Sequence, residues 1–200
     1  MTSDNAQRPS SAELEAAVAA SAGRELGSGY QASVRLHATT AGTVVVKTPH
    51  GGALGFVWRY LLRRENDVYA RLRGIAGIPR SFGLLHGCEL ALEYVEGPSL
   101  REHEARLTDR SAFFARLLGT LRAMHEAGVA HGDLKRKDNI IVGKGEQPFL
   151  IDFGIAFRRS ATSALWNRFA FERIRQMDLN AWVKLKYGRR IDPEEEPGVL

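Results

Sequence analysis

Two neighbouring motifs constrain the fold of this chain more than any other feature of its sequence. A polar loop, HGDLKRKDN (131–139), runs into the short apolar segment NIIV (139–142), and a second apolar segment, FLIDF (149–153), overlaps the motif IDFG (151–154). The turn-rich sequence GKGEQP separates the two segments, so they predict a hairpin. Asn139 and Asp152 then lie on either side of that hairpin, and the fold must support polar side chains there.

The first half of the chain predicts a small sheet with helices attached. Residues 1–10 are polar and indicate a disordered arm, and Ser10 with Glu13 resembles a capping box that opens a helix. Glycines and β-branched runs, such as GTVVVK, are typical of antiparallel strands joined by tight turns. The expected elements are a helix at 12–22, strands within 26–47, an amphipathic helix at 54–73 and a strand at 90–95.

The second half predicts a mainly helical region. Apolar residues recur at helical spacing between Phe113 and His125 and stop at Gly128, and residues 162–187 again look helical. We therefore expect an α+β fold with a disordered arm (1–11), a sheet-containing N-terminal lobe (12–96) and a helical C-terminal lobe (97–200). Only 46 residues follow Gly154, so we expect that second lobe to be minimal.

Composition and charge exclude several classes of protein. With 44% hydrophobic and 26% charged residues, the chain is neither fibrous nor membrane-embedded. Twenty-eight Lys and Arg against 23 Asp and Glu give a net charge of +5, which favours anionic partners. Cys88 is the single cysteine, so no internal disulfide forms, and we expect a buried thiol in a reducing compartment. The N-terminus lacks a secretory pattern, so a cytoplasmic protein is expected.

Two features of the first half suggest phosphate binding. Gly27, Gly29 and Val34 belong to a glycine-rich turn, GSGYQASV, whose bare backbone N–H groups can approach phosphate oxygens, although an ordinary hairpin turn has the same composition. Lys47 ends the apolar strand VVVK, and Glu65 follows in the next predicted helix. Such a pair can hold α- and β-phosphates; the alternative is a solvated strand end and a surface helix charge.

The polar loop and the motif after it supply groups for catalysis. Asp133, in a loop after a buried helix, is a candidate to accept or orient a hydroxyl proton, and Lys135 can neutralise charge on a transferring phosphoryl group. Asn139 and Asp152 offer hard oxygen ligands that suit Mg²⁺ bound together with substrate phosphates.

Taken in order, these motifs resemble the protein-kinase-like superfamily from residue 25 to about residue 157. VVVK is similar to its lysine strand, HGDLKxxxN to its catalytic loop and IDFG to its magnesium motif. The resemblance implies a bilobal kinase fold and transfer of the γ-phosphoryl group of ATP, with Mg²⁺, to a hydroxyl acceptor. It also implies that the backbone from Glu93 to Val95 binds adenine after a gatekeeper, Leu92, and that Val34 covers the base.

The sequence departs from that family at several positions. Ala32 replaces the third glycine, and Gly132 replaces the arginine usual before the catalytic aspartate. Asn139 lies one position further from Asp133 than in the usual motif, so either Asn139 or Asp138 is the metal ligand. The short C-terminal part resembles the RIO-like kinases and the bacterial lipopolysaccharide-core sugar kinases, so the acceptor is a Ser or Thr side chain or a core sugar. By analogy with that group, Asp178 would support the catalytic loop from below and His131 would be structural.

Two clusters of arginine and aromatic residues leave a further choice open. They suit peripheral contact with an anionic membrane surface, at the inner face of the membrane, or else they are helices with buried aromatics and solvated arginines. The clusters are Trp58, Arg59, Tyr60, Arg63 and Arg64, and Trp166, Arg168, Phe169, Phe171, Arg173 and Arg175. A catalytically inactive nucleotide-binding scaffold is the alternative to an active kinase. A nucleic-acid-binding module would leave the ordered carboxylates unexplained, so no specific nucleic acid is expected.

Overall fold

The computed structural model describes residues 11–28, 32–39, 42–160 and 165–188. The chain forms two compact units, one comprising Met1–Ala70 and Arg80–Tyr94, and the other Arg71–Pro79 and Val95–Leu200. The predicted arm at 1–11 lies outside the described residues except for Ser11. Residues 71–79 group with the second unit, because they contact its helix and hairpin, for instance through the Gly77 carbonyl, which accepts from the Leu150 N–H at 2.8 Å.

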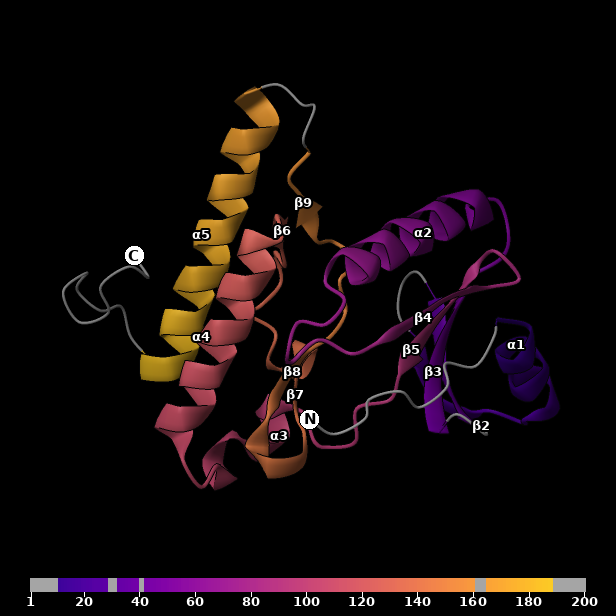
Figure 1. The fold of residues 1–200 in the computed structure, drawn as a ribbon, viewed down its shortest axis with the longest axis horizontal. Coiled ribbons are helices and arrows are strands. Elements are labelled where there is room, and N and C mark those ends of the chain that lie inside the picture. The colour runs from indigo at the N-terminus through magenta and orange to yellow at the C-terminus, as the bar shows by residue number, and fades with distance from the viewer. Residues whose placement is uncertain (1–10, 29–31, 40–41, 161–164, 189–200) are drawn as a thin grey trace. The chain divides into compact units, whose positions relative to one another are not determined.

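The first unit is built around an antiparallel sheet with strand order β1-β2-β3-β5-β4 (Figure 1). The strands are β1 (Arg24–Ser28), β2 (Ala32–Thr39), β3 (Gly42–Pro49), β4 (Ser81–Leu85) and β5 (Glu89–Glu93). The β-branched run at 44–46 forms the centre of β3, which pairs with β2 on one side and β5 on the other. Such residues favour this position because their branched side chains pack well on a pleated, buried surface.

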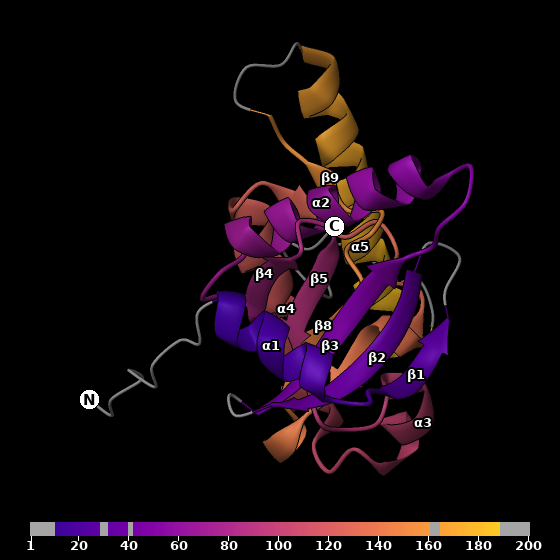
Figure 2. The ribbon, with the colours of Figure 1, turned by 90° about the vertical axis from the view of Figure 1, so that its right-hand side faces the viewer.

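Different helices pack against the two faces of this sheet. Val44, Val46 and Ala91 lie on one face and are buried together with Leu14 of helix α1 (Ser11–Ala20), which crosses the strands (Figure 2). Because side chains alternate along a strand, Lys47 lies on the opposite face. Helix α2 (Gly55–Arg71) contacts that second face, so its side chains can reach Lys47.

The second unit is organised around two long antiparallel helices, α4 (Arg110–Glu126) and α5 (Leu165–Tyr187). Trp182 of α5 is buried, donates its indole N–H to the Phe114 carbonyl at 2.9 Å, and meets the Phe114 ring edge-on. The remaining elements are α3 (Leu100–His103), the 3-10 turns at Glu104–Arg106, Lys137–Asn139 and Lys144–Glu146, and two short ladders. These ladders are β6 (Val129–Ala130) with β9 (Phe157–Arg158) and β7 (Ile140–Val142) with β8 (Pro148–Leu150).

The predicted elements are present, with ends shifted by a few residues. The hairpin predicted from NIIV and FLIDF is β7–β8, and the α+β class is confirmed. The expectation for Cys88 is wrong in one respect, because its side chain is half-buried rather than buried, in the turn between β4 and β5. Among the residues that the structure describes, no helix is long and apolar enough to span a bilayer.

Candidate active site

Lys47 and Glu65 form an ion pair within the first unit. The Lys47 ammonium donates to Glu65 Oε1 at 2.7 Å, and the two side chains are 15% and 2% exposed. β3 ends close to this point and presents Lys47 on the face opposite α1, while Glu65 lies on the buried side of α2. The alternatives of a solvated strand end and a surface helix charge are therefore wrong for this pair.

The glycine-rich segment is only partly described. Gly29 lies outside the described residues, and Gly27 lies within β1 rather than in a turn, opposite Val34 of β2. A Cβ atom placed on Gly27 would meet no described protein atom within 4 Å, and its φ is not in the left-handed range, so packing does not require glycine here. Val34 is half-buried and pairs with Lys47 across β2 and β3, which places both side chains on one face of the sheet.

The predicted adenine-binding segment begins at the end of β5. Leu92 is buried at 5% exposure, whereas Glu93 is exposed and Val95 is half-buried. The N–H groups of Glu93 and Tyr94 donate to the carbonyls of Arg80 at 2.8 Å and Thr43 at 3.2 Å. The segment is thus anchored to the neighbouring backbone on both sides.

In the second unit, the loop 131–139 holds Asp133 and Asn139 against each other. The Asn139 amide donates to the Asp133 carbonyl at 3.1 Å and to its carboxylate Oδ2 at 3.3 Å. Asn139 is buried, but the side chain of Asp133 remains 28% exposed, with the guanidinium of Arg136 at 3.8 Å from Oδ2. Lys135 is exposed on the same loop. The Asp133 carboxylate is therefore oriented by its neighbours while remaining accessible to a substrate.

A buried carboxylate in α5 supports this loop from within the unit. Asp178 is 1% exposed and accepts the backbone N–H groups of His131 at 2.7 Å and Gly132 at 2.9 Å. His125 of α4 completes the cluster, with its Nε2 at 3.1 Å from the Asp178 carboxylate. The prediction that Asp178 supports the loop is confirmed, and the alternative of an exposed helix carboxylate is wrong.

His131 connects the loop to the segment that carries Asp152. Its Nδ1 accepts the Asp133 N–H at 3.3 Å, so its Nε2 carries the proton that is donated to the Ile151 carbonyl at 3.0 Å. The Ile151 N–H in turn donates to the Asn139 carbonyl at 3.0 Å. These bonds hold the residue before Asp152 beside the loop, and His131 has the structural role expected for it.

Asp152 itself has an unusual backbone conformation. It is exposed with φ of +65°, a left-handed value that few residues other than glycine adopt, although aspartate tolerates it better than most. The next residue, Phe153, is buried with its ring 4.9 Å from that of His131. The turn at Asp152 therefore buries one side chain and exposes the preceding carboxylate.

Gly132 occupies a position that favours glycine. Its φ is +81°, and hydrogen bonds fix both neighbouring residues, because the His131 N–H donates to Asp178 and the Asp133 N–H donates to the His131 ring. A side chain here would be strained, which gives a local reason for glycine where the related motif has arginine.

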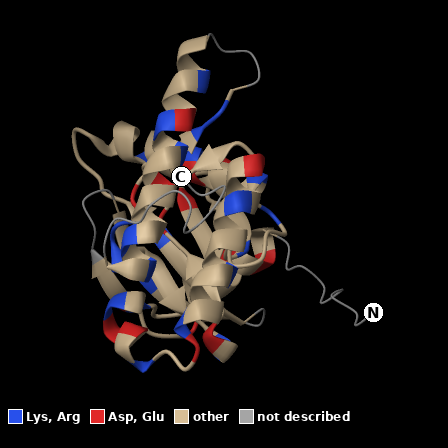
Figure 3. Cartoon of the chain, turned by 90° about the vertical axis from the view of Figure 1, so that its left-hand side faces the viewer, with Lys and Arg blue, Asp and Glu red and all other residues tan. Residues whose placement is uncertain are grey.

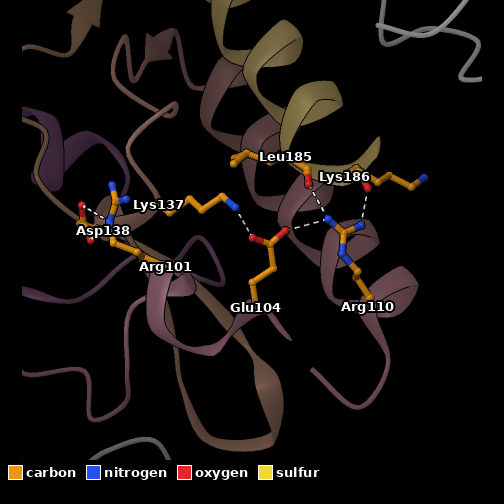
Figure 4. A network of polar contacts seen from close by, with 7 residues as sticks. All are labelled: Arg101, Glu104, Arg110, Lys137, Asp138, Leu185 and Lys186. Carbon is orange, nitrogen blue, oxygen red and sulfur yellow. Dashed lines mark hydrogen bonds and ion pairs between the residues drawn. The ribbon is translucent and has the colours of Figure 1, made fainter. Parts of the chain in front are cut away.

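A second polar network fixes the far end of the loop (Figure 4). Glu104 forms ion pairs with Lys137 of the loop and with Arg110 at the start of α4, and its carboxylate lies 2.8 Å from the Arg110 guanidinium. Arg110 also donates to two carbonyls in the last turn of α5, those of Leu185 and Lys186. Burial by itself raises the pKa of Glu104, but the hydrogen bonds from Lys137 and Arg110 outweigh that effect, and the pKa lies below its usual value. The carboxylate is therefore held charged.

Asp138, the alternative metal ligand, is engaged elsewhere. Its two carboxylate oxygens accept from the Arg101 Nε of α3 at 2.8 and 3.0 Å, as Figure 4 shows. This hydrogen bond lowers the pKa of Asp138 below its usual value. Asp138 and Asn139 thus have different surroundings, an exposed ion pair and a buried contact with Asp133.

The structure groups the predicted residues into two sets. Lys47, Glu65, Gly27, Val34 and Glu93 belong to the first unit, and Asp133, Lys135, Asn139, Asp152 and Val95 belong to the second. The sequence did not indicate Glu104, Arg101 or His125, because lone charged residues in or before a helix are common and their partners are distant in the chain. The distance along the chain is 33 residues for Glu104 and Lys137 and 53 for His125 and Asp178.

The donor set of the second unit fits Mg²⁺ better than a transition metal. Among the described residues, no group of three or more His, Cys, Asp or Glu side chains could hold a metal by itself. Magnesium needs fewer protein ligands, because it retains waters and shares the oxygens of substrate phosphates. The exposed Asp152 carboxylate and the amide oxygen of Asn139, whose Nδ2 is directed to Asp133, are the groups of this unit that could serve as such ligands.

Comparison with known proteins assigns the family. Residues 21–172 match the family model described as the protein kinase domain, and this span includes both sets of residues. The chain therefore belongs to the protein kinase family, which confirms the expected kinase-like fold. Protein kinase domains transfer the γ-phosphoryl group of ATP to hydroxyl groups with the help of divalent metal ions.

Curated relatives share part of their length with this chain. A putative cyclin-dependent kinase F-2 of Oryza sativa subsp. japonica is 35% identical over 139 residues, which cover 59% of this chain and 40% of that protein. The probable serine/threonine-protein kinase fnkB of Dictyostelium discoideum is 29% identical over 108 residues, which cover 50% of this chain and 20% of that protein. Sperm motility kinase 3A of Mus musculus is 45% identical over 56 residues, which cover 28% of this chain and 10% of that protein. This chain thus spans less than half the length of these relatives.

Proposed function

We propose that this protein is an active kinase that transfers the γ-phosphoryl group of ATP, with Mg²⁺, to a hydroxyl acceptor. The observation that carries the proposal is the loop 131–139, in which Asn139, His131 and Asp178 together orient an accessible Asp133 carboxylate. Catalysis by such a site consists mainly of positioning and charge stabilisation, because no covalent enzyme intermediate is needed.

The predicted residues of the first unit, with Val95, are proposed to bind the nucleotide. Lys47, held by Glu65, would contact the α- and β-phosphates, and the backbone of Glu93 and Val95 would bind adenine beneath Val34. The open space above Gly27 supports this assignment, since close approach of a phosphate group gives a reason for glycine that protein packing does not. Gly29 would act in the same way.

The residues of the second unit are proposed to act on the acceptor. Asp133 would orient the hydroxyl group and accept its proton, and Lys135 would neutralise charge on the transferring group. Asp152 and Asn139 would hold Mg²⁺, which would neutralise charge on the phosphate groups of the nucleotide. We favour Asn139 over Asp138 because Arg101 already engages both oxygens of Asp138.

For the acceptor we propose a serine or threonine side chain of a protein. The printed names of two relatives describe a cyclin-dependent kinase and a serine/threonine-protein kinase, which supports this class. A core sugar of lipopolysaccharide is the second candidate, and the resemblance of the sequence at 63–80 and 177–190 to lipopolysaccharide-core kinases and their RIO-like relatives supports it. We propose a cytoplasmic location for either activity.

The test is transfer of label from γ-labelled ATP with Mg²⁺ to a bacterial protein extract and, in parallel, to a core lipopolysaccharide preparation. We expect Asp133→Asn to lower kcat by roughly 10²- to 10⁴-fold, because general-base and orienting contributions are of that size, while ATP affinity changes little. The control is Glu126→Gln, at an exposed position of α4.

The outcomes separate the alternatives. Label in proteins of the extract supports a serine/threonine kinase, whereas label confined to the glycolipid assigns a sugar kinase. If ATP binds but no acceptor is labelled, the protein is a nucleotide-binding scaffold. If Asp133→Asn retains full turnover, the protein is a kinase but the proposed role of Asp133 is wrong.

A further inference from the structure

The first turns of α5 expose large apolar side chains on one face. Leu165, Trp166 and Phe169 are 86%, 74% and 59% exposed, and Met177 is 45% exposed. At 3.6 residues per turn these positions lie on one side of the helix, opposite the buried Phe171. Of the two alternatives for this cluster, the one with buried aromatics holds for Phe171, whereas Trp166 and Phe169 lie on the surface.

This end of α5 extends past the end of α4 and is held in place by polar contacts (Figure 1). The Asn167 side chain accepts the Ser160 N–H at 2.9 Å and donates to the Arg158 carbonyl at 3.3 Å, which fastens the first helical turn to the preceding segment. The rings of Trp166 and Phe169 stack, with their centroids 6.2 Å apart. The apolar face is thus presented by an anchored helix.

Exposed arginines lie beside these apolar side chains. Arg168 and Arg173 are exposed on the same turns, and Glu172 is paired with Arg175 at 2.7 Å. Arg158 and Arg159 lie on the adjoining strand and loop, and Arg159 lies over the buried Phe171 ring at 5.4 Å. Basic positions outnumber acidic ones at this end of the helix (Figure 3). A partner that covers this face must therefore tolerate or prefer positive charge.

We propose that the α5 face, defined as Leu165, Trp166, Phe169 and Met177 with the flanking Arg168 and Arg173, binds the surface of an anionic lipid bilayer. Tryptophan and phenylalanine beside arginine suit the interface, because the rings enter the boundary of the acyl chains while the guanidinium groups meet anionic headgroups. The face belongs to a helix whose first turns extend past the end of α4 (Figure 1), so α4 does not obstruct its contact with a flat layer of lipid.

A second copy of the chain fits this face less well. A symmetric contact would place the same patch against itself, and the arginines of one copy would then approach those of the other. Repulsion between like charges opposes such a contact, whereas an anionic bilayer neutralises each of these arginines. Charge complementarity therefore favours lipid.

The experiment is vesicle flotation of the purified full chain. We expect binding to phosphatidylcholine vesicles that contain about one quarter phosphatidylglycerol to be at least roughly tenfold stronger than binding to phosphatidylcholine alone. Trp166→Ser combined with Phe169→Ser should weaken binding to the anionic vesicles by roughly tenfold or more, because the inserted apolar area is lost. Arg168→Gln combined with Arg173→Gln should remove most of the preference for anionic lipid.

The matched control changes exposed aromatic residues of α2, Phe56→Ser with Tyr60→Ser, which are 71% and 61% exposed. This control should bind vesicles as the wild type does. Absence of vesicle binding, unchanged binding of the α5 variant, or an equal loss in the α2 variant would overturn the proposal. A concentration-dependent dimer in sedimentation velocity that the α5 variant abolishes would assign the face to a second copy instead. Transfer to a soluble acceptor should not change, so this test is independent of the kinase assay.

Discussion

At the scale of single residues, Glu65 shows how a buried charge depends on its partner. Its side chain is 2% exposed and meets the Lys47 ammonium at 2.7 Å. A buried carboxylate without a cation is costly, because the lost hydration is not replaced. Removing the lysine should therefore destabilise the fold as well as impair nucleotide binding.

We expect Lys47→Met to lower the free energy of unfolding by about 2 kcal/mol, less than the roughly 3–5 kcal/mol typical of a fully buried pair, because Lys47 is partly exposed. The double variant Lys47→Met with Glu65→Gln should recover part of that loss, since no unpaired charge remains. Urea unfolding measures the free energy of unfolding of the single and the double variant, and Arg59→Met, on the exposed side of α2, is the control. A double variant less stable than the single one would contradict this account.

At the scale of elements, α5 acts on the loop 131–139 through one side chain. Asp178 accepts two backbone N–H groups of the loop, from residues 47 and 46 positions earlier in the chain, and contacts His125, so one side chain of a distant helix fixes the loop backbone. Apart from the 3-10 turn Lys137–Asn139, the loop has no regular secondary structure to hold its shape. Its conformation depends on this contact and on the bonds of His131.

Replacing this carboxylate tests that dependence. Asp178→Asn presents one acceptor oxygen where two are used, so we expect a loss of roughly 2–3 kcal/mol in the free energy of unfolding. We also expect kcat to fall at least tenfold, because Asp133 is displaced. Glu172→Gln, on the exposed face of the same helix, removes one surface ion pair and should cost about 0.5 kcal/mol or less. Equal stability and activity of the two variants would refute the supporting role of Asp178.

At the scale of the whole molecule, the acid stability of the protein reflects carboxylates whose pKa values the fold has lowered. Glu104 is one, since its bonds to Lys137 and Arg110 outweigh the opposing effect of burial on its pKa. A carboxylate with a lowered pKa in the folded state stabilises the protein above its unfolded pKa of about 4.3, and that contribution disappears as the pH falls through the folded value.

Glu104→Gln should therefore be less stable than the wild type at pH 7, by about 1 kcal/mol, and this difference should shrink as the pH falls below about 4.3. Thermal or urea unfolding across that pH range measures it, and Glu126→Gln provides the comparison. A difference that stays constant with pH would show that Glu104 acts through packing and not through its charge.

The sequence by itself determined the order of the motifs, the elements that carry them and the residues with chemical groups for phosphoryl transfer. Spacing over a few residues suffices for this, because strand alternation, helical periodicity and turn composition are local properties. The positions of Lys47, Asp133 and Asp152 at or near the ends of strands and in loops follow from such local patterns.

Only the tertiary structure decided which partner each charged group meets. It buried Asp178 and exposed Trp166, although both lie in α5, and it directed Asp138 to Arg101 and Asn139 to Asp133, although the two are neighbours. These choices depend on contacts between segments that are distant in the chain. The free energy of burying or exposing a side chain is set by those contacts, and the local sequence does not contain it.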